Sequence, residues 1–349
     1  MNTPVLVHVI SKKGKGCKYA EEHPEKYHGV GKFDPVTGDM PEAAPCFSSV
    51  FGKKLTQLAE INHDIVAITA AMCAGTGLTE FAERFPKRFF DVGIAEEHAV
   101  AMAAGMAKQS LTPVVAIYSG FLQRAYDMLI HDVSLQDLHV VFCVDRAGLV
   151  GNDGETHHGA FDISYLRSVP NMQVLCPASF AELEVMLNEA INHMSGPVAI
   201  RYPRGGEGRY TDCMTDGCIK LRDGNDITIA SYGTDINIAL DTADILADRG
   251  IYADMFKLAR LDKRYYGDII TSMGKTGRFL MSEQVCQTGC IADEILACAE
   301  RDGVRIDAAY TPNLGSGIVV QGTVPELTVH CGLDAESLAD EAEKLVRGE

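Results

Sequence analysis

The sequence has no excess of positive charge, and this absence narrows the classes of protein to which it can belong. Its 349 residues include 31 Lys and Arg against 48 Asp and Glu, which gives a formal net charge of −17. Such a balance disfavours nucleic acid and anionic membranes as partners. A long apolar run is also missing, so we predict no membrane span, and residues 1–10 lack the basic flank of a signal peptide.

Clustered cysteines are missing too. The eleven cysteines are scattered without a CxxC pair, and the closest pairs are Cys286 with Cys290 and Cys213 with Cys218. No histidine accompanies either pair, so we predict no metal site in this chain. Scattered cysteines in apolar segments indicate reduced thiols, and with the composition they predict a cytoplasmic location.

Alternating helix and strand patterns predict an α/β protein with two domains. Residues 1–45 are rich in Gly, Lys and Pro and predict an extended arm. Residues 46–205 alternate helical periodicity with short apolar runs, which is typical of a doubly wound α/β domain. The polar residues 206–225 are interpreted as a linker, and residues 226–349 as a second, smaller α/β domain.

The segment FDVGIAEEHAV at 90–100 is the most informative stretch of the chain. A short apolar strand passes through Gly93 into a helix whose first turn carries Glu96 and Glu97. A carboxylate at the carboxyl end of a parallel strand can be desolvated and used to handle a proton. The alternative is an acidic first turn that only complements the helix dipole.

Other predicted strands also end in polar side chains. Because ligands bind beyond the carboxyl ends of the strands in open α/β sheets, these residues predict a single site. The strands at 114–118, 140–145 and 197–202 are followed, in order, by Phe121 and Arg124, by Arg146 and a polar glycine-rich loop at 151–162, and by Arg204.

These motifs resemble the 1-deoxy-D-xylulose-5-phosphate synthase family, thiamine-diphosphate enzymes of the transketolase superfamily. The resemblance implies a doubly wound transketolase-like pyrimidine-binding domain followed by a smaller α/β transketolase carboxyl-terminal domain, and it weakens beyond residue 205. The segments that carry it are DVGIAEEHAV at 91–100, AIYSGFLQRAYD at 116–127, VDRAGLVG at 144–151, DGETHHGAFD at 153–162 and RYPRG at 201–205.

For the cofactor, the resemblance implies that Glu96 hydrogen-bonds the aminopyrimidine of thiamine diphosphate and promotes its imino tautomer. Phe121 matches the aromatic residue that stacks on the pyrimidine, and Ile94 is a further cofactor-binding position. The family usually has Gln where this chain has Glu97, so a second acid lies beside the site. An ordinary core phenylalanine is the alternative for Phe121.

For the substrates, the resemblance implies pyruvate as donor and glyceraldehyde 3-phosphate as acceptor, in the entry step to a route of isoprenoid biosynthesis that also supplies thiamine. Arg146 and Arg204 match the pair that grips the acceptor phosphate, and guanidinium groups suit that role because they donate paired hydrogen bonds. Tyr118 and Arg124 match positions along the substrate channel. A surface ion pair is the alternative for either phosphate-binding arginine.

Histidines and one acid complete the implied site. Asp153 and His157 match residues that contact the donor-derived intermediate and the acceptor hydroxyls. A histidine near neutrality can transfer protons, and His158 is an adjacent alternative that the sequence does not separate from His157. His28 resembles a histidine that the family's interdomain arm places near the reacting centre.

One family motif does not occur in this sequence. In the family, an amino-terminal domain holds Mg²⁺ and the cofactor diphosphate through a Gly-Asp-Gly motif with a downstream Asn, and residues 1–10 resemble the final strand of that domain. We therefore expect a truncated chain, a fragmentary gene product or one half of a split enzyme. It should bind the cofactor weakly and have little activity alone, with a homodimer and a separate amino-terminal domain chain as expected partners.

Two other functions remain open. A β-type subunit of a split transketolase or of a 2-oxo-acid dehydrogenase has the same pair of domains and needs a separate Gly-Asp-Gly chain. A non-catalytic interaction fragment is the second alternative. The complete set of implied site residues argues against decay, and the arginine pair favours the synthase because the lipoyl acceptor of a dehydrogenase carries no phosphate.

Overall fold

The computed structural model describes residues 3–24, 27, 31–41 and 44–348 and divides into two units, Met1–Ala44 and Pro45–Glu349. The first unit holds helix α1 (Lys18–Glu22), and the ring of Tyr27 packs edge-on against Phe33 with centroids 5.2 Å apart. Residues 5–10 are exposed and form no strand. His28, predicted as a catalytic residue, lies outside the described residues.

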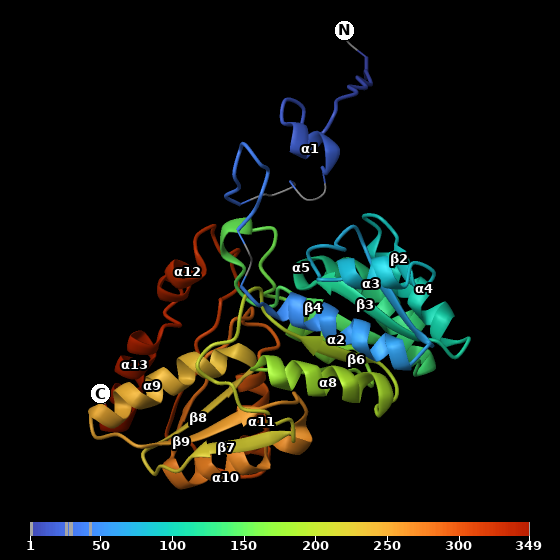
Figure 1. Cartoon of the computed structure of the whole chain (residues 1–349). Coiled ribbons are helices and arrows are strands. Elements are labelled where there is room, and N and C mark those ends of the chain that lie inside the picture. The colour runs from blue at the N-terminus through green and yellow to red at the C-terminus, as the bar shows by residue number, and fades with distance from the viewer. Residues whose placement is uncertain (1–2, 25–26, 28–30, 42–43, 349) are drawn as a thin grey trace. The chain divides into compact units, whose positions relative to one another are not determined.

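The second unit contains a six-stranded sheet in which every strand runs parallel to its neighbours (Figure 1). Its strands are near-continuous runs of apolar residues, as expected for strands covered on both faces. In spatial order they are β2 (Phe89–Asp91), β1 (Ile65–Thr69), β3 (Thr112–Tyr118), β4 (Val141–Asp145), β6 (Val198–Arg201) and β5 (Gln173–Leu175).

Helices cover both faces of this sheet, and alternate residues of each strand divide between two hydrophobic clusters. Helices α2 (Phe47–Ile61) and α8 (Phe180–Asn192) lie side by side on one face, and α4 (Glu96–Ala107) packs on the other (Figure 1). The shorter helices of this domain are α3 (Thr79–Arg84), α5 (Ser119–Leu122), α6 (Tyr126–Met128) and α7 (Asp162–Ser168).

A second, five-stranded sheet follows, in the order β11 (Ala308–Tyr310), β10 (Arg278–Leu280), β8 (Ile227–Tyr232), β9 (Ala253–Leu258) and β7 (Cys218–Arg222). Its helices are α9 (Ile236–Asp248), α10 (Gly267–Thr276), α11 (Ile291–Arg301), α12 (Val324–His330) and α13 (Ala335–Arg347). The predicted fold class, a doubly wound α/β domain followed by a smaller α/β domain, is confirmed.

Strand β7 differs from the sequence prediction, because it lies inside residues 206–225, which were interpreted as a linker. It is the one antiparallel strand of the second sheet and pairs at the edge with β9. Cys218, Ile219 and Leu221 are apolar but none of the five residues of this strand is fully buried, as an edge strand allows. A polar composition therefore indicates either a linker or an edge strand that other elements cover only in part.

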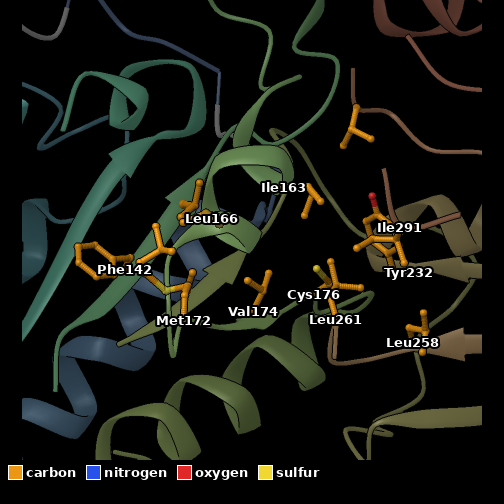
Figure 2. Close-up of a cluster of buried hydrophobic side chains, with 14 of the residues drawn as sticks. Phe142, Ile163, Leu166, Met172, Val174, Cys176, Tyr232, Leu258, Leu261 and Ile291 are labelled. Carbon is orange, nitrogen blue, oxygen red and sulfur yellow. The ribbon is translucent and has the colours of Figure 1, made fainter. Parts of the chain in front are cut away.

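The two sheets share one hydrophobic core. Residues 163–176 of the first domain belong to the same hydrophobic cluster as Tyr232, Leu258 and Ile291 of the second, and Figure 2 shows Cys176 beside Leu261 where the two domains meet. A fully buried ion pair reinforces this contact, with 2.6 Å between Lys257 Nζ and Glu182 Oε1. Among the described residues, no helix is long and apolar enough to cross a membrane.

We expect Lys257→Met to lower the free energy of unfolding by about 3–5 kcal/mol, because the buried carboxylate of Glu182 keeps its hydrogen bonds from Tyr210 and Met214 but loses its cationic partner. The control is Lys263→Met, whose ammonium is half-exposed beside Glu294 and should cost less than about 1 kcal/mol. Denaturant unfolding followed by circular dichroism suits a chain without tryptophan. Equal losses in the two variants would contradict the assigned importance of the buried pair.

Candidate active site

Glu96 is the first residue of helix α4 and is 1 % exposed, whereas its neighbour Glu97 is only partly buried. The turn before the helix is shaped by Asp91, whose Oδ1 accepts hydrogen bonds from the backbone N–H groups of Ala71 and Gly93 at 2.8 and 3.0 Å. Gly93 has φ +73°, a conformation that glycine adopts without strain. The turn thus directs one of the two acids inward.

Arg124 contacts Glu96 directly, with 2.6 Å between Arg124 Nη1 and Glu96 Oε2. The arginine is half-exposed and the carboxylate is buried, so the pair has one face in solvent. The sequence placed Arg124 along a substrate channel and did not predict this ion pair.

Phe121 lies in helix α5, immediately after strand β3, and is partly buried. Its ring stacks on Tyr118 with centroids 5.8 Å apart, and meets the ring of His157 edge-on at 5.1 Å. The side chain borders the hydrophobic core without being enclosed by it. One aromatic cluster therefore joins the end of β3 to the loop at 151–162.

Arg146 follows strand β4 with a left-handed φ of +60°. Its guanidinium carbon is 3.9 Å from the centroid of the Tyr118 ring, and its side chain is only 14 % exposed. Nη1 donates to the carbonyl of Gly75 at 2.7 Å and lies 2.9 Å from Oδ1 of the buried Asp145. Arg146 is thus held by buried groups and does not form a surface ion pair.

Electrostatics around Arg146 follow from this burial. Burial raises the pKa of Asp145, although the adjacent Arg146 and a 2.7 Å hydrogen bond from Ser48 Oγ favour its ionised form. Burial is the largest single effect and works to lower the pKa of Arg146, but Asp145, Tyr118 and Tyr202 together outweigh it and the net shift is upward. Burial also raises the pKa of Tyr118, so its hydroxyl stays protonated at neutral pH.

Sequence reasoning missed Ser48, Gly75 and Asp145, which hold Arg146 and Tyr118 in place. A Cβ on Gly75 would lie 1.7 Å from the Tyr118 hydroxyl oxygen, so this position needs glycine. Asp145 was visible only as the last residue of a strand, and Ser48 belongs to a helix 97 residues earlier. No local signal in the sequence connects them.

Arg204 pairs with Asp153, with 2.5 Å between Nη1 and Oδ2, and both side chains are about 40 % exposed (43 and 35 %). Nη1 also donates to the carbonyl of Val150 at 3.3 Å. A surface ion pair was the alternative to phosphate binding for both arginines. Arg204 forms such a pair, and Arg146 does not. Both groups remain accessible from solvent.

His157 and His158, which the sequence could not separate, have different environments. His158 is buried, and its Nδ1 accepts from the Val150 backbone N–H at 3.2 Å while Nε2 lies 3.2 Å from the Val320 carbonyl oxygen. Both ring nitrogens are therefore used in holding the backbone. His157 is partly exposed and faces Phe121, so it is the histidine that can meet a ligand.

Most of the predicted residues lie in one region, because contacts link Tyr118 to Phe121, Arg146 and, through Phe121, to His157. The charges of Asp153 and Arg204 also act on the Tyr118 hydroxyl. Ile94, predicted to contact cofactor, is 80 % exposed. Among the described residues, no group of three His, Cys, Asp or Glu side chains could hold a metal ion.

Comparisons with known families match the two domains separately. Residues 44–206 match the family described as "Transketolase, pyrimidine binding domain". Residues 217–338 match the family described as "Transketolase, C-terminal domain".

Curated relatives are named 1-deoxy-D-xylulose-5-phosphate synthase. The protein from Natranaerobius thermophilus is 44 % identical over 100 % of this chain and 56 % of its own length. The protein from Carboxydothermus hydrogenoformans is 54 % identical over 71 % of this chain and 41 % of its own length. The chain spans about half the length of the curated relatives it matches.

Solved structures of similar fold are transketolases. An inactive β4 tetramer of a split-gene transketolase is 26 % identical, with a TM-score of 0.77 over 87 % of this chain and 99 % of that chain. Pichia stipitis transketolase, solved with sedoheptulose 7-phosphate, is 17 % identical with a TM-score of 0.71, over 88 % of this chain and 46 % of its own. The second likeness concerns the fold alone.

We expect Gly75→Ala to displace the Tyr118 ring and lower the free energy of unfolding by about 1–3 kcal/mol, because the new methyl group overlaps the hydroxyl. Gly105→Ala is the control, since a Cβ there meets nothing within 4 Å, and alanine in a helix should stabilise by up to about 1 kcal/mol. Unfolding curves and near-ultraviolet circular dichroism of the tyrosines report the two effects. If both variants behaved alike, the close fit of Tyr118 against Gly75 would be wrong.

Proposed function

We propose, from the premise that this chain belongs to the transketolase family, that it is the pyrimidine-binding and carboxyl-terminal part of a 1-deoxy-D-xylulose-5-phosphate synthase. The whole enzyme would convert pyruvate and glyceraldehyde 3-phosphate into 1-deoxy-D-xylulose 5-phosphate and carbon dioxide. The observation that carries the proposal is the buried carboxylate of Glu96, which lies beyond the carboxyl ends of the strands, as the other predicted residues do.

The residues present fit the pyrimidine half of thiamine diphosphate, which when bound supplies a thiazolium carbon nucleophile. Glu96 offers a buried carboxyl group that would share a proton with a pyrimidine ring nitrogen, which accepts the hydrogen bond. Arg124 compensates the negative charge of that carboxylate at 2.6 Å. Phe121 offers a partly buried ring, and aromatic stacking adds about 1 kcal/mol beyond burial.

Two guanidinium groups would bind the acceptor phosphate. Arg146 is fixed by Asp145 and Gly75, so it loses little freedom when an anion binds. Arg204 can change its partner. A bound phosphate could replace Asp153 in the ion pair, and the carboxylate of Asp153 would then be free to accept a hydrogen bond from an acceptor hydroxyl. His157, beside Phe121, would then be placed to transfer a proton.

The diphosphate and its Mg²⁺ would be held outside the residues described. We propose that activity requires a Gly-Asp-Gly domain, either on a separate chain or on a longer form of this one. A homodimer and a cytoplasmic location remain predictions from the family resemblance and from composition.

The second candidate is a β-type subunit of a split transketolase, and one finding favours it. The split-gene transketolase chain matches this one over 99 % of its own length, and its β4 tetramer is an inactive one. A gene for a Gly-Asp-Gly domain beside the gene for this chain would support that alternative. The product formed in a mixture of the two chains would distinguish a synthase from a transketolase.

Glu96→Gln should lower carbon dioxide release from pyruvate by at least about 100-fold in a mixture with a Gly-Asp-Gly domain, because the amide cannot hold the proton. The matched control is Glu97→Gln, which installs the residue usual in the family and should stay within a few-fold of the unsubstituted chain. An active Glu96→Gln variant would remove the main support for the proposed site.

Arg204→Met should lower kcat/KM for glyceraldehyde 3-phosphate by about 10- to 100-fold, because a charged hydrogen bond to phosphate is worth about 1.5–3 kcal/mol. Its kinetic parameters for pyruvate should stay nearly unchanged, since pyruvate carries no phosphate. Steady-state kinetics with each substrate varied in turn gives both numbers. Equal effects on the two substrates would speak against a phosphate-binding role.

A further inference from the structure

A cavity of about 140 Å³ lies between the two domains, apart from the aromatic cluster of Tyr118, Phe121 and His157. Of the predicted site residues, only Arg204 lines it. From the first domain it is also lined by Arg201, Pro203 and residues 147–149, and from the second by residues 232–235, Gln284 and Val324.

The cavity lies where an open α/β sheet binds ligands. In the second sheet β8 lies between β10 and β9, so the chain order reverses between β8 and β10. Gly233 to Asp235 follow the carboxyl end of β8, and Gln284 follows that of β10. Ligands bind in open sheets at such a switch point, beyond the carboxyl ends of the strands.

Arg201 supplies an independent sign of a ligand. Its side chain is 8 % exposed, and its Nε donates to Oδ2 of the buried Asp162 at 2.7 Å. Its Nη2 is buried and has no hydrogen-bond partner among the described residues. Arg201 lines the cavity, and among the described residues only its Nε has a hydrogen-bond partner, so the guanidinium has hydrogen-bonding capacity left for an acceptor oxygen there.

The start of helix α9 adds a second preference for an anion. This 13-residue helix follows Gly233 to Asp235, three residues that line the cavity. The positive end of its dipole and its first backbone N–H groups favour negative charge. Arg204 also lines the cavity, but its Nη1 is held by Asp153 and by the Val150 carbonyl, so Arg201 is the guanidinium on which the site depends.

Asp235 limits which anion fits. Its Oδ1 accepts from Gln284 Nε2 at 2.7 Å and its Oδ2 from the Gln284 backbone N–H at 3.3 Å. A carboxylate oxygen has a second lone pair, so each can accept one more hydrogen bond. An oxyanion that carries no proton cannot donate a hydrogen bond to this carboxylate, and the negatively charged oxygens of the two groups would repel each other.

We propose that the cavity binds free hydrogen phosphate, an oxyanion that accepts from Arg201 through one oxygen and donates its own proton to Asp235. The proposal does not depend on the synthase activity, because it concerns binding alone. Burial raises the pKa of Asp235 to about 6, against the opposing effects of Arg201 and Gln284, so its side chain is an acceptor above neutrality.

The test is calorimetric titration of the full chain at about pH 8 with inorganic phosphate, sulfate and methyl phosphate. At that pH inorganic phosphate keeps one proton, whereas sulfate and a phosphate monoester, with its second pKa near about 6, carry none. We expect phosphate to bind at least about tenfold more tightly than either of the others. Equal affinities, or tighter binding of methyl phosphate, would overturn the proposal.

Asp235→Asn makes the test specific to this cavity, because the amide can donate to an anion that has no proton. We expect this variant to gain at least about tenfold in sulfate affinity and to lose its preference for phosphate. Asp248→Asn removes the same charge from the exposed far end of α9 and should keep the original preference. An unchanged preference in Asp235→Asn would place the anion elsewhere.

Arg201→Lys addresses the other side of the cavity. Lysine keeps the charge but loses the planar fork that lets Arg201 serve Asp162 and the anion together. We expect phosphate affinity to fall at least about tenfold. If this variant did not fold, the gain of sulfate binding in Asp235→Asn would still decide the matter, since a misfolded chain cannot produce it.

Discussion

Parallel pairing is the constraint on which the rest of this structure depends. All six strands of the first sheet run in one direction, so the residues that follow them gather at one end of the sheet, beyond the carboxyl ends of the strands. Glu96 and Arg124 meet there, as do Tyr118 and Arg146, although each partner comes from a different strand connection. The hydrophobic core that the two domains share then holds the second sheet against the first.

The sequence predicted the features that depend on local pattern. Apolar runs located the strands, and the turn around Gly93 placed an acid at the start of a helix. The family resemblance, and not periodicity, selected Glu96 over Glu97, and the structure buries the selected residue. Strand β7 was missed because an edge strand needs little hydrophobicity.

Features that depend on contacts distant in sequence were not predictable. Ser48 reaches Asp145 across 97 residues, and Gly75 makes room for Tyr118. His157 and His158 look alike in a polar loop, and only the fold shows which one is used by the backbone. The cavity beside Arg201 required knowing where the second sheet reverses its strand order.

The central claim is that this chain holds one half of a catalytic site that another domain completes. The most direct measurement mixes the chain with the separately produced amino-terminal domain of a related synthase, thiamine diphosphate and Mg²⁺, and records carbon dioxide release from pyruvate with and without glyceraldehyde 3-phosphate. The account predicts release and formation of 1-deoxy-D-xylulose 5-phosphate in the mixture and neither from the chain alone. Full activity of the chain by itself, or an inactive mixture in which the two chains bind each other, would contradict it.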